Sequence, residues 1–207
     1  MALWLDLRDD KMVVMTSRSQ DAGVTWAANQ TLYRSPDGSV CTCCQPMIAA
    51  DGAGAVAAMW RNDLGGARDM YLCTSQDGGA TFGTATKLGE GTWNLRQCPM
   101  DGGGVAVAGA RVDTVWRRDR SLFSCAPKAA EVALGEGTNP TTAFCADQSL
   151  RAWQSNDRIF LKCAEAPARD IGAGSYPFIA APHGKGNAVL VWQGSDGAMV
   201  MRVAVSY

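Results

Sequence analysis

An eight-residue pattern that occurs twice constrains the fold of this chain more than any other feature. One copy runs from Ser19 to Trp26 (SQDAGVTW) and the other from Ser75 to Phe82 (SQDGGATF), 56 positions further on. In such a pattern the Asp side chain accepts hydrogen bonds from backbone donors of its own turn, and Gly adopts a backbone angle that other residues avoid. The pattern predicts a tight hairpin turn whose last aromatic ring fills an apolar gap. Its defining residues are Asp21, Gly23, Thr25, Trp26, Asp77, Gly79, Thr81 and Phe82.

Five tryptophans mark a longer repeat. Each ends an apolar segment and precedes a short polar turn, and successive members are 56, 56, 37 and 39 residues apart. These spacings are close to the roughly 40–50 residues of a propeller blade. Equivalent positions in successive blades indicate packing between blades, whereas Trp93 lies off the repeat and is predicted to contact a ligand. The five repeating residues are Trp4, Trp60, Trp116, Trp153 and Trp192.

Composition and residue order are typical of an all-β protein. Glycine accounts for 23 of 207 residues, and Val-, Thr- and Trp-rich runs are broken by Asp-Gly and Gly-Gly pairs. The net charge of −1 and the lack of a basic stripe argue against nucleic acid and anionic membranes as partners. The apolar runs are shorter than the roughly 20 residues of a membrane helix. We expect one monomeric domain over 1–207, with blades over roughly 1–34, 35–93, 94–138, 139–175 and 176–207.

The two eight-residue copies resemble Asp boxes, the bacterial neuraminidase (BNR) repeat of sialidase-like β-propellers. This resemblance implies an all-β fold of four-stranded blades, about six in a complete ring. Residues 1–10 lack the basic leader and apolar core of a signal peptide and are typical of a strand within a blade. We therefore expect about five blades here, with the N-terminal part of a longer parent protein missing.

A denser resemblance covers residues 4–116. The segments Val40 to Pro46, Met59 to Asn62 and Cys98 to Gly104 look like a group of bacterial sialidase-like repeat proteins. Members of this group usually carry an export signal and have no activity that we can assign, so the resemblance implies a periplasmic or secreted parent protein. Thr42 and Met47 depart from the Glu and Ser that are commoner in the group.

Cysteines supply the candidate chemistry. Cys41, Cys43 and Cys44 precede the first strand of one predicted blade and Cys98 precedes that of the next, so the two segments can meet on one face. If residues 41–44 are extended, Cys41 and Cys43 point one way and Cys44 the other. Two interpretations stay open. A disulfide from Cys98 to Cys43 or Cys44 would staple the two blade entrances.

In the other interpretation, thiolates form a copper or zinc site, with the thioethers of Met47 and Met100 favouring Cu(I). Copper or zinc is expected as a cofactor only in this second interpretation, and the disulfide interpretation implies none. Four further cysteines are predicted to be structural, since buried thiols behave as small apolar groups. These are Cys73, Cys125, Cys145 and Cys163, of which Cys145 is also considered as a partner of Cys125 or Cys163.

The resemblance to sialidases also implies a set of catalytic candidates. That family clamps a substrate carboxylate with three arginines and uses a Tyr nucleophile, a Glu and an Asp. The family's N-terminal Phe/Tyr-Arg-Ile-Pro motif is absent here, and the single histidine, His183, lies in a predicted loop. For Arg61, Arg68 and Asp69, a network of ion pairs and turns at the blade edge is the preferred interpretation. The candidates are Arg61, Arg68, Arg111, Arg117, Asp63, Asp69, Asp101 and Tyr176.

The sequence therefore predicts a non-catalytic binding or scaffold protein with a cysteine cluster at a blade entrance. Its ligand would be a glycan or a protein contacting Trp93, Arg61, Arg68 and Asp101. The alternative is an exo-α-sialidase or a related glycoside hydrolase.

Overall fold

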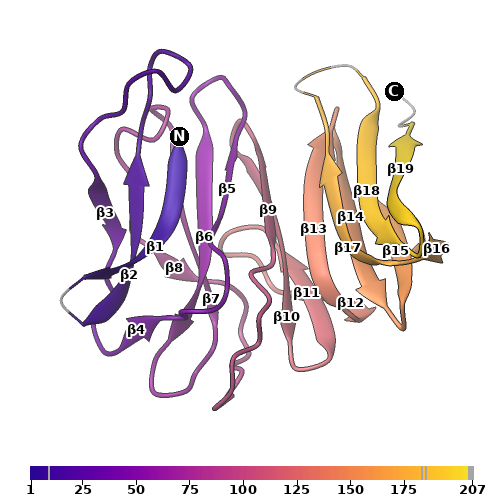
Figure 1. Ribbon diagram of the computed structural model, residues 1–207, viewed down its shortest axis with the longest axis horizontal. Helices are drawn as coiled ribbons and strands as arrows, with labels where there is room; N and C mark the ends of the chain where they lie inside the picture. The colour runs from indigo at the N-terminus through magenta and orange to yellow at the C-terminus, as the bar shows by residue number, and fades with distance from the viewer. Residues whose placement is uncertain (9, 183, 185, 205–207) are drawn as a thin grey trace.

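The computed structural model describes residues 1–8, 10–182, 184 and 186–204, so His183 lies outside the described residues (Figure 1). The described chain consists of β-strands, turns and loops, without a helix. No helix in this part of the chain is long and apolar enough to cross a membrane.

In the described part of the chain, five antiparallel sheets follow one another in sequence order. The first contains β1 (Ala2–Arg8), β2 (Lys11–Ser17) and β3 (Gln30–Tyr33), and the second contains β4 (Ser39–Val40), β5 (Met47–Ala50), β6 (Val56–Asp63), β7 (Met70–Ser75) and β8 (Thr86–Lys87). The third contains β9 (Gly104–Ala108), β10 (Arg111–Arg118), β11 (Ser121–Cys125) and β12 (Val132–Glu136). The fourth contains β13 (Thr138–Cys145), β14 (Gln148–Ser155), β15 (Arg158–Cys163) and β16 (Arg169–Ala173), and the fifth contains β17 (Ser175–Ala180), β18 (Ala188–Gly194) and β19 (Gly197–Val203).

The sheets pack side by side as blades. The first sheet lies at one end of the long axis and the last at the other (Figure 1). Strand β5 of the second sheet and strands β9, β13 and β17, which open the next three sheets, lie next to one another in this order. Buried apolar clusters fill the spaces between the first and second, the second and third, and the fourth and fifth sheets. The all-β, blade-like architecture predicted from the sequence is confirmed.

Four of the repeating tryptophans, Trp60, Trp116, Trp153 and Trp192, are buried packing residues in β6, β10, β14 and β18, whereas Trp4 in β1 is only partly buried. Trp116 lies opposite Phe123 and Trp153 opposite Phe160, with ring centroids 6.1 and 6.0 Å apart. Trp60 is fully buried and lies opposite Tyr71. A large ring facing another large side chain across two strands stabilises the hairpin while filling the space between blades.

Both eight-residue turns form as the sequence predicts, but their aromatic residues differ. Phe82 packs against the buried cluster between the first two sheets. Trp26 is 50% exposed and donates its indole N–H to the carbonyl of Gly23 at 3.1 Å. The prediction that the ring fills an apolar gap is therefore confirmed for Phe82 and wrong for Trp26.

The four cysteines predicted to be structural carry free thiols, so the alternative pairing of Cys145 with Cys125 or Cys163 is wrong. Cys73, Cys125 and Cys145 are buried and Cys163 is partly buried. Burial raises the pKa of the Cys73 thiol to about 12, which keeps it protonated and unreactive.

Candidate functional site

The cysteine cluster, which we define as Cys41, Cys43, Cys44 and Cys98, joins the entrances of the second and third blades. Cys43 and Cys98 form a disulfide whose Cα atoms are 6.2 Å apart. The bond ties the turn at residues 41–44, just after β4, to the segment that leads into β9. One of the two predicted disulfide pairings is thus present.

The three sulfur atoms of the turn lie close together. Cys41 Sγ is 3.5 Å from Cys43 Sγ and 3.5 Å from Cys44 Sγ. Because residues 42–44 form a turn, the expectation for an extended segment, with Cys41 and Cys44 on opposite sides, is wrong. Cys41 and Cys44 are buried, Cys43 is partly buried and Cys98 is exposed. The cluster therefore has an inner pair of thiols and an outer pair joined as a disulfide.

The inner pair is electrostatically asymmetric. The hydrogen bond between Cys41 and Cys44, the backbone N–H of Cys43 and the nearby Arg68 cation lower the pKa of Cys41 to about 6, against the opposing effect of burial. The same hydrogen bond, together with burial, raises the pKa of Cys44. Arg68 donates from Nη1 to Cys41 Sγ at 3.3 Å. One sulfur of the pair is consequently favoured as a thiolate and the other as a thiol.

Arg61 is a buried cation beside the cluster, with only 1% of its surface exposed. Its guanidinium donates to the main-chain carbonyls of Asp101 (3.2 and 3.1 Å), Arg68 (2.7 Å) and Arg117 (3.0 Å). Burial lowers the pKa of Arg61, while the negative charges available at Cys44 and Asp101 act in the opposite direction. Arg61 therefore fastens three chain segments together and supplies positive charge to the cysteine cluster.

Arg117 and Asp101 form an ion pair next to Arg61. Arg117 Nε lies 3.0 Å from Asp101 Oδ2, and Arg117 Nη2 donates to the carbonyl of Pro99 at 2.8 Å. The Asp101 carboxylate also accepts from the backbone N–H groups of Gly103 and Asn139, both at 3.2 Å, and its side chain is 2% exposed. This carboxylate is thus held by the start of β9 and by β13, and it links two blades.

Trp93 lies within this network. The guanidinium carbons of Arg61 and Arg117 are each 5.2 Å from the centroid of the Trp93 ring, a cation–π geometry. Its backbone N–H donates to Asp69 Oδ1 at 3.0 Å, and Asp69 in turn pairs with Lys87 at 3.4 Å. Trp93 is partly buried, so the ring predicted to face a ligand also contacts arginines of its own chain.

Arg68 completes the group that the structure brings together. It pairs with Asp63 at 2.8 Å and donates to the carbonyl of Leu95 at 3.3 Å, in addition to its contact with Cys41. Arg111 does not join this group, because it begins β10 and pairs with Asp147 at 3.2 Å.

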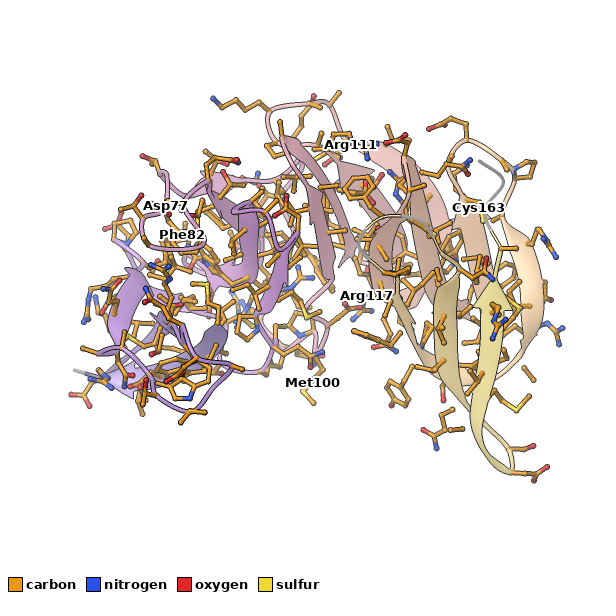
Figure 2. All side chains as sticks on the ribbon, turned by 90° about the horizontal axis from the view of Figure 1, so that it is seen from above. Asp77, Phe82, Met100, Arg111, Arg117 and Cys163 are labelled. Carbon is orange, nitrogen blue, oxygen red and sulfur yellow. A yellow bond between two sulfur atoms is a disulfide. The ribbon has the colours of Figure 1, made fainter. Side chains whose placement is uncertain are left out.

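Tyr176 and Met100 line a separate cleft of about 280 Å³, which we call the Tyr176 cleft. Tyr176 is 66% exposed, and the described lining includes Asp101 and Asn139 but no glutamate. Met100 is 71% exposed and extends from the surface in Figure 2. The role of Met100 as a metal ligand therefore stays a prediction.

The sequence did not predict the contact of Arg68 with Cys41, nor that Arg61 is buried and donates to main-chain carbonyl groups of three segments. One signal was present for Arg61. It directly follows a repeating tryptophan, as Arg117 does in the next blade, so both arginines occupy a repeated structural position. A residue type that recurs at the same place in a repeat is first a packing or hydrogen-bonding element of that repeat.

Solved sialidases share this arrangement of sheets. The intramolecular trans-sialidase from Ruminococcus gnavus, in complex with oseltamivir carboxylate, matches with a TM-score of 0.56 and 11% identity over 89% of this chain and 46% of that chain. A mutant of the NanB sialidase from Streptococcus pneumoniae matches with a TM-score of 0.55 and 7% identity over 88% of this chain and 32% of that chain. The chain thus spans less than half the length of either sialidase.

At these identities the likeness establishes the fold alone. The chain has a sialidase-like β-propeller fold, as its sequence predicts. No model of a protein family matches the chain, and no curated protein matches it.

Proposed function

We propose that this chain is a non-catalytic Asp-box scaffold of the BNR type whose reduced cysteine cluster binds a soft metal ion. One observation carries the proposal: the sulfur atoms of Cys41, Cys43 and Cys44 lie within 4.8 Å of one another, and Cys98 is bonded to one of them. Reduction of that bond would provide four thiols at one place. Thiolate sulfur is a preferred ligand of both Cu(I) and Zn(II).

The surrounding charge supports metal binding. Several thiolates around one metal ion give the site a net negative charge, and burying such a charge costs free energy unless cations lie nearby. Arg68 contacts Cys41 at 3.3 Å, and the buried Arg61 lies beside Cys44. The hydrogen bonds of Arg61 described above go to neutral carbonyl groups, so its charge remains available to the Asp101 carboxylate and to thiolate sulfur.

A sialidase activity is the second candidate, favoured by the fold and by the meeting of Arg61, Arg68 and Arg117. A substrate clamp, however, needs guanidinium groups that face a cavity. Arg61 is 1% exposed and is engaged by carbonyls of its own chain. Tyr176 lies in a cleft whose described lining contains no glutamate that could activate it. These observations support binding rather than hydrolysis.

The proposed setting is a periplasmic or secreted protein, where the Cys43–Cys98 disulfide persists until a reductant opens it and the cluster becomes able to bind metal. A glycan or protein ligand would meet the protein at the Tyr176 cleft and at the rim formed by Trp93 and Arg117. The metal would be held behind this surface, at the cysteine cluster.

Metal titration of the fully reduced, oxygen-free protein tests the proposal. We expect one Cu(I) or Zn(II) ion per chain, measured by competition with a chromophoric chelator and by elemental analysis. Cys41→Ser and Cys44→Ser should lose most of this binding, whereas Cys73→Ser should retain it because Cys73 lies in β7, outside the cluster. Absence of metal uptake after all four thiols have been counted as reduced would overturn the proposal. Turnover of a fluorogenic sialoside would instead support the hydrolase.

A further inference from the structure

The inner and outer cysteine pairs differ in both exposure and redox state. The outer pair, Cys43 and Cys98, is a disulfide with Cys98 exposed, and the inner pair, Cys41 and Cys44, consists of buried free thiols. We propose that the two pairs form an internal thiol–disulfide relay, in which Cys41 opens the outer disulfide and Cys44 completes the transfer. The relay needs no metal and is therefore independent of the proposed metal binding.

Distances between the sulfur atoms support both steps of the relay. Cys41 Sγ is 3.5 Å from Cys43 Sγ, at the upper end of the roughly 3–3.5 Å expected for atoms poised to react. Cys44 Sγ is also 3.5 Å from Cys41 Sγ, so the second nucleophile already contacts the sulfur that it must attack. No large rearrangement of the turn is required for either step.

Sequence spacing favours the inner pair as the alternative disulfide. Cys41 and Cys44 are separated by two residues, the C-x-x-C spacing that is used by thiol–disulfide oxidoreductases. The turn at 42–44 brings their sulfur atoms together, as such a disulfide requires. An extended segment would have separated them.

The two steps balance without any external reagent. In the first, Cys41, having lost its proton, attacks Cys43 Sγ; the Cys41–Cys43 bond forms, the Cys43–Cys98 bond breaks, and Cys98 leaves with the electron pair and takes up a proton. In the second, Cys44 loses its proton and attacks Cys41 Sγ, which forms Cys41–Cys44 and releases Cys43 to be protonated. The inner dithiol is oxidised by two electrons and the outer disulfide is reduced by two.

Contacts around Cys41 hold the attacking sulfur in place. Its backbone N–H donates to the carbonyl of Arg61 at 2.9 Å, and its sulfur accepts from Arg68 at 3.3 Å. Arg68 is itself fixed by Asp63 at 2.8 Å. Because Cys98 is exposed, the outer pair is where a thiol or disulfide of another molecule would exchange with the relay.

Alkylation in the absence of reductant tests the relay. The folded, metal-free protein is incubated with excess N-ethylmaleimide and a chelator, quenched with acid, and mapped by mass spectrometry. Each exchange exposes a free Cys98 thiol that the reagent traps, so Cys98 should become labelled roughly tenfold or more faster in wild type than in Cys41→Ser, which lacks the attacking thiol. Cys44→Ser should stop after the first step and accumulate the Cys41–Cys43 disulfide. Cys73→Ser should behave as wild type.

Labelling of Cys98 at the same slow rate in wild type and in Cys41→Ser would overturn the relay. So would the absence of a Cys41–Cys43 bond in Cys44→Ser, or a labelling rate that rises in proportion to protein concentration, which would indicate exchange between molecules. Circular dichroism confirms that each variant is folded, and the Cys44→Ser result stands by itself if Cys41→Ser does not fold. Metal binding is measured separately on fully reduced protein, so either proposal can fail while the other holds.

Discussion

Arg61 and Arg117 occupy equivalent positions in consecutive blades, and the guanidinium carbons of both lie 5.2 Å from the centroid of the same Trp93 ring. Each arginine directly follows a repeating tryptophan. Arg61 is buried and bound to carbonyls, whereas the Arg117 side chain is 19% exposed and pairs with Asp101. One repeated position thus supplies both an internal brace and an ion pair between two blade entrances.

Arg61→Met should strongly destabilise the protein. The substitution roughly preserves the volume of the side chain but leaves the buried carbonyls of Arg68, Asp101 and Arg117 without their donor. Breaking a buried charged network of this kind costs about 3–5 kcal/mol of unfolding free energy. Urea denaturation measures the change in unfolding free energy. Arg111→Met serves as the control because Arg111 is exposed at the start of β10. Its ion pair with Asp147 should contribute less than about 1 kcal/mol. Equal effects of the two substitutions would contradict a bracing role for Arg61.

Acid should weaken the two eight-residue turns. Hydrogen bonds from Thr25 and Ser19 lower the pKa of Asp21 from 3.8 to about 2, and those from Ser75 and Thr81 lower the pKa of Asp77 further. A carboxylate whose pKa is lower in the folded than in the unfolded state stabilises the protein fully at pH values above its unfolded-state pKa. This stabilisation is lost as the pH falls through its folded-state pKa. The loss should therefore run from about pH 3.8 down to about 2 for Asp21.

Thermal melting of wild type and of the Asp21→Asn, Asp77→Asn double variant across this range checks the prediction. The double variant should have a lower melting temperature at neutral pH and a shallower decline in acid, because the groups that titrate in the turns are gone. An unchanged slope would mean that other carboxylates control the acid sensitivity.

The sequence was sufficient to predict the parts of this fold that repeat. The tryptophan period and the paired Asp turns are local patterns, and each predicts a hairpin from residues that are near in sequence. The partners of Arg61 were not predictable, because its acceptors are carbonyls whose positions depend on how blades two and three dock. The meeting of Cys41 with Cys44 was missed for another reason: it depends on a turn at 42–44, where an extended segment was the simplest expectation.

Gly102→Ala should disturb the contact between the entrances of the second and third blades. A Cβ at this position would overlap the carbonyl oxygen of Gln45, which directly follows the cysteine turn. Backbone cannot yield as a flexible side chain can, so we expect a loss of about 1–3 kcal/mol in unfolding free energy. The comparison is Gly109→Asn, since Gly109 has a φ of +58°, an angle that Asn tolerates, and no atom lies within 4 Å of a Cβ there. Similar melting temperatures for wild type and Gly102→Ala would show that the Gln45 carbonyl does not lie close to Gly102.

Loss of the outer disulfide should destabilise the protein without altering its fold. Cys98→Ser removes a crosslink that spans 55 residues and joins two blade entrances, and such crosslinks typically contribute about 2–4 kcal/mol, in large part by restricting the unfolded chain. Because Cys98 is exposed, the serine hydroxyl can be solvated, so little of the loss should arise from desolvation. Guanidinium denaturation of wild type with and without a reducing agent, beside Cys98→Ser, measures the effect. Reduced wild type and Cys98→Ser should unfold at the same denaturant concentration. If Cys98→Ser were instead as stable as oxidised wild type, the crosslink would not stabilise the blade entrance.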